Sequence, residues 1–74
     1  MRLEFFTATA GDFEVAYNWL SENYKVTNSE KLDHGFVIEL SDNGEIHQEQ
    51  LIDRLYEILE EANDDHDILI EIGD

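Results

Sequence analysis

A stripe of apolar residues between positions 46 and 63 constrains the fold more than any other feature of the sequence. The stripe consists of Leu51, Ile52, Leu55, Ile58, Leu59 and Ala62. An α-helix has ~3.6 residues per turn, so this spacing places all six side chains on one side and leaves polar residues on the other. The pattern predicts a long amphipathic helix over residues 46–63. Such a helix must bury its apolar side against another layer of structure.

The rest of the chain contains short apolar runs and one further helical pattern. Residues 9–12 have the form of an N-terminal capping box, with Asp12 in place of the usual Glu or Gln, and helical spacing follows. The turn-forming residues 41–44 end the apolar run before them. The predicted elements are strands over 2–8, 24–32, 36–40 and 67–72, and helices over 10–23 and 46–63.

This order predicts an α+β fold of the βαββαβ split type, the ferredoxin-like sandwich. Two helices then cover one face of a four-stranded antiparallel sheet, and right-handed crossovers place the first and third strands in its centre. The polar run 24–32 is expected at a sheet edge. If that run is irregular, a three-stranded sheet with the same helices remains. No repeat, proline or flexible linker interrupts residues 1–74, which we expect to form a single domain.

Composition limits what such a chain can do. A domain of 74 residues buries only about 60% of the surface of its unfolded chain, so a deep catalytic cavity is not expected. The absence of cysteine excludes disulfides and thiolate metal sites. We expect no targeting segment at the start of the chain, and no run approaches the roughly 18 apolar residues of a membrane span. These features predict a cytoplasmic protein with no membrane partner.

Net charge is the main indication of function. Nineteen acidic and four basic residues give −15, and the acids are concentrated in the second half of the chain. Residues 1–32 hold five acids and three bases, whereas residues 33–74 hold fourteen acids and a single base, Arg54. A field of this sign repels nucleic acids and anionic lipids, and it attracts protein surfaces that bind phosphates. The charge therefore predicts no direct nucleic-acid binding.

Two groups of residues are candidates for binding a basic partner. On the outer side of the helix 46–63, carboxylates follow one another at intervals of about four residues, which spaces them by roughly 5–6 Å. This carboxylate row consists of Glu49, Asp53, Glu57, Glu60, Glu61 and Asp64. It is either a phosphate-like binding surface or an ordinary solvated helix face.

The second group is predicted from alternation along the strands. If Leu3 and Phe5 point toward the helices, then their neighbours in sequence lie on the open face of the sheet. This open face is expected to carry Glu4, Phe6, Val37, Glu39, Leu69 and Glu71. An apolar centre ringed by acids suits a protein partner that carries Arg or Lys. The alternative is an ordinary sheet face with some exposed apolar residues.

Metal binding and catalysis are not predicted. The acidic segment 63–67 lacks the ligand spacing of a calcium-binding EF-hand loop. His34, His47 and His66 are far apart in sequence and have no cysteine partners, so a zinc site is not expected either. There is no phosphate-binding glycine loop, nucleophile motif or cysteine nucleophile, so we expect no cofactor and no enzymatic activity.

The small size, the pI near 4 and the carboxylate row resemble the DNA-mimic inhibitors. These are phage and mobile-element proteins that block restriction, CRISPR or repair enzymes, and they include some anti-CRISPR proteins. The resemblance covers residues 33–74 and is one of composition and surface pattern. It implies an inhibitor, present in the host cytoplasm, that binds the basic surface of a nucleic-acid-binding protein.

Two other classes of function fit the same sequence. The first is an immunity or antitoxin partner that covers one nuclease. The second is a small regulatory or structural module that dimerises through the apolar edge strand 68–72, although acidic residues flank that strand as protected edges require. The protein is expected to be a monomer or a weak homodimer.

Overall fold

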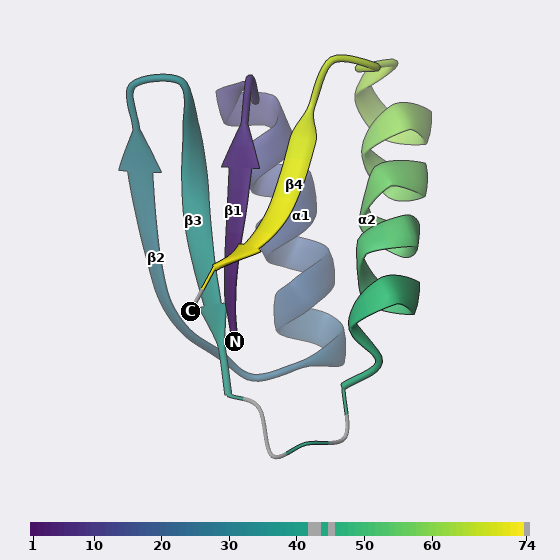
Figure 1. Ribbon diagram of the computed structural model, residues 1–74. Helices are drawn as coiled ribbons and strands as arrows, with labels where there is room; N and C mark the ends of the chain where they lie inside the picture. Colours follow the sequence, from purple (N-terminus) through teal and green to yellow (C-terminus); the bar gives the residue numbers. More distant parts are fainter. Residues whose placement is uncertain (42–43, 45, 74) are drawn as a thin grey trace.

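The computed structural model describes residues 1–41, 44 and 46–73 and has the predicted βαββαβ order (Figure 1). Its elements are β1 (Arg2–Phe6), α1 (Ala10–Asn23), β2 (Val26–Leu32), β3 (Gly35–Leu40), α2 (Gln48–Asn63) and β4 (Leu69–Gly73). All six predicted elements are present, with ends that differ from the prediction by at most two residues. The turn predicted at 41–44 lies partly outside the described residues.

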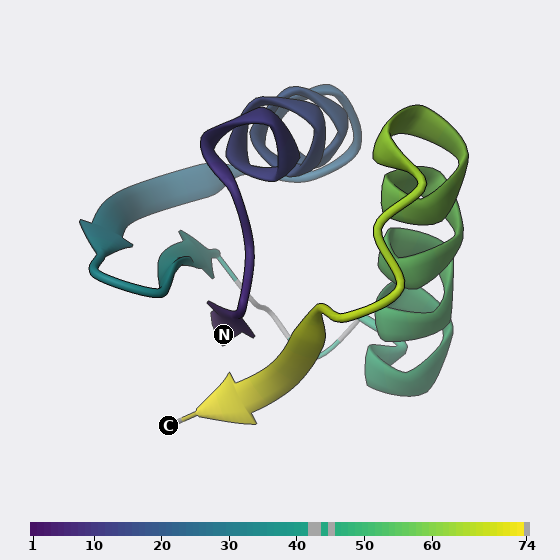
Figure 2. The same ribbon diagram turned by 90° about the horizontal axis from the view of Figure 1, so that it is seen from above.

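The four strands form one antiparallel sheet in the order β2-β3-β1-β4, so the first and third strands are central as predicted. Leu3 lies opposite Ile38 on one side and Ile72 on the other. Figure 2 shows α1 and α2 on the same side of the sheet, which leaves its other side open. The ferredoxin-like sandwich is therefore confirmed.

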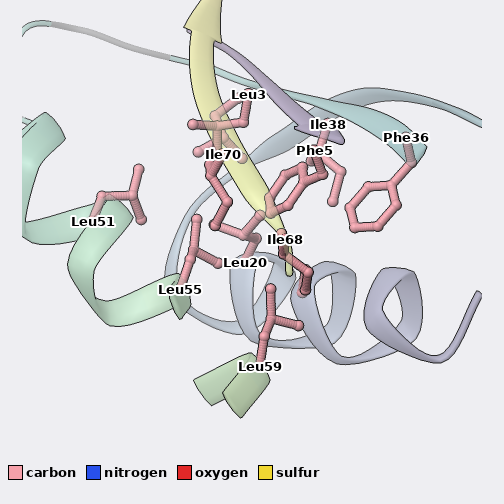
Figure 3. Close-up of a cluster of buried hydrophobic side chains, with 12 residues drawn as sticks. Leu3, Phe5, Leu20, Phe36, Ile38, Leu51, Leu55, Leu59, Ile68 and Ile70 are labelled. Atoms are coloured by element: carbon pink, nitrogen blue, oxygen red, sulfur yellow. The ribbon is translucent and has the colours of Figure 1, made fainter. Parts of the chain in front are cut away.

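A single hydrophobic core lies between the sheet and the two helices (Figure 3). Alternate residues of β1 and β3 point into it, together with three leucines of α2, two residues of α1 and two isoleucines at β4. Ala62, at the end of the predicted apolar stripe, is exposed instead. Its buried members are Leu3, Phe5, Ala16, Leu20, Phe36, Ile38, Leu40, Leu51, Leu55, Leu59, Ile68 and Ile70. At roughly 25 cal/mol per Å² of buried apolar area, this core is the main source of stability.

Helix α1 begins with the predicted capping box. The side chain of Thr9 accepts a hydrogen bond from the backbone N–H of Asp12 at 3.2 Å, and the carboxylate of Asp12 accepts one from the backbone N–H of Thr9 at 3.0 Å. These bonds satisfy two of the N–H groups that a helix start leaves without partners. The side chain of Asp12 is fully buried, which the sequence did not indicate.

Three side chains differ in burial from what their positions in the sequence suggest. Val37 lies on the open face as predicted, between Glu4 of β1 and Glu30 of β2, but it is only 2% exposed there. Tyr17 is 36% exposed, although it shares the helical spacing of the core residues of α1. Ile72 is partly buried and packs against the core near the end of edge strand β4.

Strand β2 has the exposed-edge character that was predicted. Only Val26 among its residues is partly buried, and the pairing with β3 shifts register between Val26 and Asn28. Such a bulge bends an edge strand and discourages pairing with another chain. Within the described part of the chain, no helix has both the length and the apolar content to span a bilayer.

Candidate functional site

The carboxylate row lies on α2 and its C-cap, on the side turned away from the core. All six members are exposed: Glu49, Asp53, Glu57, Glu60, Glu61 and Asp64. The opposite side of α2 buries Leu51, Leu55 and Leu59. That burial fixes the rotation of the helix about its axis, so the row cannot turn inward without exposing the core. At ~1.5 Å per residue the row extends over roughly 22 Å.

Part of the row is paired with the side chains of Arg54 and His66. Arg54 contacts Glu57 at 3.0 Å, and His66 lies 3.5 Å from Glu60 and 3.1 Å from Asp64. These side chains are about half exposed or more, where an ion pair contributes only about 0–1 kcal/mol. They therefore restrain the carboxylates without burying them.

The other three members of the row have no ion-pair partner in the described part of the chain. They are Glu49, Asp53 and Glu61, which lie near the start, the middle and the end of α2. Their carboxylates are the ones most available to an external cation.

The open face of the sheet forms the second candidate surface, and the strand register orders it in lines that cross the strands. One line consists of Glu30, Val37, Glu4 and Glu71, and the next consists of Asn28, Glu39, Arg2 and Gly73. The guanidinium of Arg2 lies 3.3 Å from the carboxylate of Glu4 and 3.4 Å from that of Glu39. Two of the three predicted acids on this face are therefore already paired within the protein, and Glu71 is exposed.

An apolar line completes the open face at the end nearest the β2–β3 turn. It consists of Leu32, Gly35, Phe6 and Leu69. Phe6 and Leu69 were predicted here, whereas Leu32 and the acidic Glu30 were missed. The signal that places them is the pairing of β2 with β3, which weak alternation in residues 24–32 did not define.

A polar cluster around the buried Asp12 links the end of α2 to the start of α1. The amide nitrogen Nδ2 of Asn63 donates to Oδ1 of Asp12 at 2.8 Å, and Oδ1 of Asp65 accepts from the backbone N–H of Asp67 at 3.0 Å. Burial alone would raise the pKa of Asp12, but hydrogen bonds from the Thr9 N–H, Asp65 and Asn63 outweigh it and lower that pKa. The hydrogen bond with Asp12 raises the pKa of Asp65. The protonated form of Asp65 is thus the one that can donate a hydrogen bond to Asp12.

The edge of β4 next to α2 is partly covered. The backbone N–H of Ile70 donates to the hydroxyl of Tyr56 on α2 at 2.8 Å, so this donor is not available for pairing with another strand. Among the residues that the structure describes, no three His, Asp or Glu side chains converge in a way that could hold a metal ion.

The two candidate surfaces point in different directions, because the outer side of α2 and the open side of the sheet lie on different sides of the molecule (Figure 2). A compact partner would therefore contact one of them at a time. All members of the carboxylate row are acidic and exposed, while the open face mixes acidic and apolar residues. Comparisons with protein-family models, curated proteins and solved structures found no match.

Proposed function

We propose that this protein binds the basic, nucleic-acid-binding surface of another protein through the carboxylate row of α2, and so blocks that surface. The observation that carries the proposal is the exposure of all six carboxylates along one side of a helix whose other side is buried. The net charge of −15 supports it, because it exceeds the magnitude of about 2–8 that suffices to keep a small domain soluble.

The spacing of the row is close to that of a nucleic-acid strand. Six carboxylates over roughly 22 Å correspond to about one charge per 4 Å, and a DNA strand carries one phosphate per ~3.4 Å of axis. A groove lined with Arg and Lys that follows phosphates can therefore pair with several of these carboxylates at once. DNA mimicry in this sense needs charge and spacing and does not require a copied helix shape.

Electrostatics also sets how the complex should respond to salt. Exposed charges more than about 8–10 Å apart are screened at physiological ionic strength, so binding should weaken steeply between low and high salt. The protein itself should not retard DNA or RNA in a gel, because both carry the same sign of charge.

The experiment that tests the proposal distinguishes release of the partner by competing DNA from release by a change in ionic strength. The protein is immobilised and incubated with cell lysate at low salt, and bound proteins are eluted with short duplex DNA at constant ionic strength. We expect nucleic-acid-binding proteins to elute with DNA and not with an equal concentration of free nucleotides, since only the duplex occupies an extended basic groove.

The matched control is the triple variant Glu49→Gln, Asp53→Asn, Glu61→Gln, which removes the three carboxylates without ion-pair partners. It should retain far less of the same proteins. The proposal fails if duplex DNA releases nothing that free nucleotides do not, or if the triple variant retains the bound proteins as well as the wild type does.

A further inference from the structure

The apolar line on the open face contains exposed hydrophobic side chains outside the helix-covered core. Leu32 and Leu69 are 42% and 49% exposed, and with Tyr17 they are the large hydrophobic residues that the described chain leaves exposed. Phe6 lies between them in the register, half-buried. Both helices pack on the other face, so no element of the protein covers this line (Figure 2).

Gly35 contributes no side chain to this line between Leu32 and Phe6. A Cβ atom at this position would overlap the carbonyl oxygen of Phe5 on the neighbouring strand, so only glycine fits. The close backbone approach therefore separates the two apolar side chains.

Acidic side chains run alongside the apolar line. The adjacent line, two residues along each strand and about 7 Å away, contains Glu30, Glu4 and Glu71. Counting Glu39, the described residues of the open face include four carboxylates, and Arg2 is the single base among them. A cation placed next to the apolar line is therefore attracted, and an anion is repelled.

We propose that the open face binds a cationic amphipathic helix of another protein. Its aliphatic side chains pack on Leu32, Phe6 and Leu69, and its Lys or Arg side chains point toward the acidic line. Side chains one helical turn apart are separated by roughly 5–6 Å, which is close to the ~4.8 Å spacing of the strands that the apolar line crosses. This surface goes beyond the proposed function, because it combines apolar and ionic contacts and does not involve the carboxylate row.

The charge of the open face favours a cationic helix over other possible binding partners. Nucleic acids and anionic membranes are repelled by the four carboxylates. A second copy of the chain, docked face to face, would bring eight carboxylates together with only two guanidinium groups, and like charges across an interface are costly. A cationic amphipathic helix of a different protein can both pack on the apolar line and pair with the carboxylates of the acidic line.

Two synthetic peptides of equal charge test this proposal. Each is a helix of about 14 residues, roughly 21 Å long, with lysines along one flank. The first carries three leucines at positions i, i+3 and i+7, and the second carries alanine at those positions. Affinities are measured by isothermal titration calorimetry, and the site is mapped from backbone amide shifts in ¹H–¹⁵N spectra. The quantity of interest is the ratio of the two affinities, because general electrostatic attraction cancels in it.

The leucine peptide should bind the wild type at least about fivefold more tightly than the alanine peptide, a modest share of what burying three leucine side chains contributes. It should shift the amides of Phe6, Leu32 and Leu69. The double variant Leu32→Ser, Leu69→Ser should lose most of this ratio, whereas Tyr17→Ser, at an exposed aromatic residue of α1, should retain it. Thermal unfolding of each variant verifies the fold.

Neutralising Glu49, Asp53 and Glu61 should weaken the binding of both peptides alike and leave the ratio of their affinities unchanged. The experiment therefore distinguishes a failure of the proposal for the carboxylate row from a failure of the proposal for the open face. A ratio below about fivefold in the wild type would overturn the proposal. The proposal would also be overturned if the double serine variant kept the wild-type ratio of affinities, or if the amide shifts were confined to α2.

Discussion

Asn63 donates a hydrogen bond to Asp12 at 2.8 Å, which joins the last residue of α2 to the first turn of α1 across 51 positions of sequence. Asp12 is fully buried and also completes the capping box with Thr9. One carboxylate therefore caps α1 and holds the C-terminal end of α2, where the carboxylate row finishes. This polar cluster thus links the stability of the fold to the position of the candidate binding surface.

Replacing Asp12 with alanine should destabilise the protein by about 1–3 kcal/mol, because it leaves the Thr9 N–H and the Asn63 amide without their acceptor. Thr9→Ala should cost about 1 kcal/mol, the usual effect of losing an N-cap side chain. Urea unfolding measures both. Glu14→Ala, at an exposed acid of the same helix, is the control and should change the free energy of unfolding by no more than about 0.5 kcal/mol.

Coupling between Asp12 and Asn63 can be measured directly. In a double-mutant cycle with Asp12→Ala and Asn63→Ala, residues that share a hydrogen bond should give an interaction energy of about 0.5–3 kcal/mol. Additive effects would mean that the bond between the two helices contributes nothing to stability.

Asp65→Asn should raise the midpoint of thermal unfolding at pH 7. At that pH Asp65 has lost the proton with which it can donate a hydrogen bond to Asp12, and that hydrogen bond is the main reason why the pKa of Asp65 is raised. An asparagine amide can donate to Asp12 without needing a proton, and its oxygen can keep the hydrogen bond from the Asp67 N–H. The gain should exceed that of Glu61→Gln, which removes one charge outside the cluster.

The same variant should lose its advantage in acid. The raised pKa of Asp65 means that its contribution to stability is present below its ordinary pKa of about 3.9 and is lost as the pH rises through the folded value. Asp12 has a lowered pKa, so its contribution is present at neutral pH and is lost only as the pH falls through that lower value. Melting curves at pH 7, 5 and 4 should therefore converge for wild type and Asp65→Asn. A difference in melting temperature that stays constant with pH would contradict a hydrogen bond from protonated Asp65 to Asp12.

The sequence predicted the position of a residue correctly where that position depends on the local pattern of one helix alone. The period of the apolar stripe determined that Glu49, Asp53 and Glu61 face away from the core, and the structure confirms their exposure. Thr9 and Asp12 are three residues apart, so the capping box was likewise visible as a local pattern.

Contacts between distant segments could not be predicted in this way. The bond between Asp12 and Asn63 depends on how the two helices pack, and the sequence contains no local sign of it. The place of Leu32 on the open face depends on the register between β2 and β3, and the bulge between Val26 and Asn28 interrupts any alternation that would reveal it. The burial of Val37 similarly depends on its neighbours across the strands.

Gly35→Ala should be markedly destabilising, by about 1–3 kcal/mol, because the new methyl group would overlap the carbonyl oxygen of Phe5 within the central strand pair. Gly73→Ala is the matched control at the end of β4. Its Cβ would meet only the flexible carboxylate of Glu4, at 2.9 Å from Cδ, and that side chain can move aside. Chemical denaturation measures the free energy of unfolding of both variants. Equal losses would show that the close backbone approach at Gly35 is not the cause of the destabilisation.

Neutralising the unpaired carboxylates of α2 should stabilise the fold while it weakens binding. Like charges four residues apart destabilise a helix by about 0.2–0.5 kcal/mol per pair, and Glu49, Asp53 and Glu61 take part in several such pairs. The three single variants should differ in how much they raise the free energy of unfolding. Glu61→Gln should help most, because a carboxylate near the C-terminus of a helix opposes the helix dipole. Glu49→Gln should help least, because Glu49 lies in the first turn, where negative charge is favourable.

Together the three substitutions should raise the free energy of unfolding by at most about 1–2 kcal/mol, measured by urea unfolding. The comparison variant Glu57→Gln, Glu60→Gln should gain less, because it also removes the contacts with Arg54 and His66. If the row is the binding surface, the triple variant should bind a captured partner tenfold or more weakly, about 1.4 kcal/mol in free energy. Stability and affinity would then change in opposite directions, which is expected when charges are retained for binding and not for folding. A triple variant that is more stable and binds as tightly as the wild type would mean that the row is only a solvated helix face.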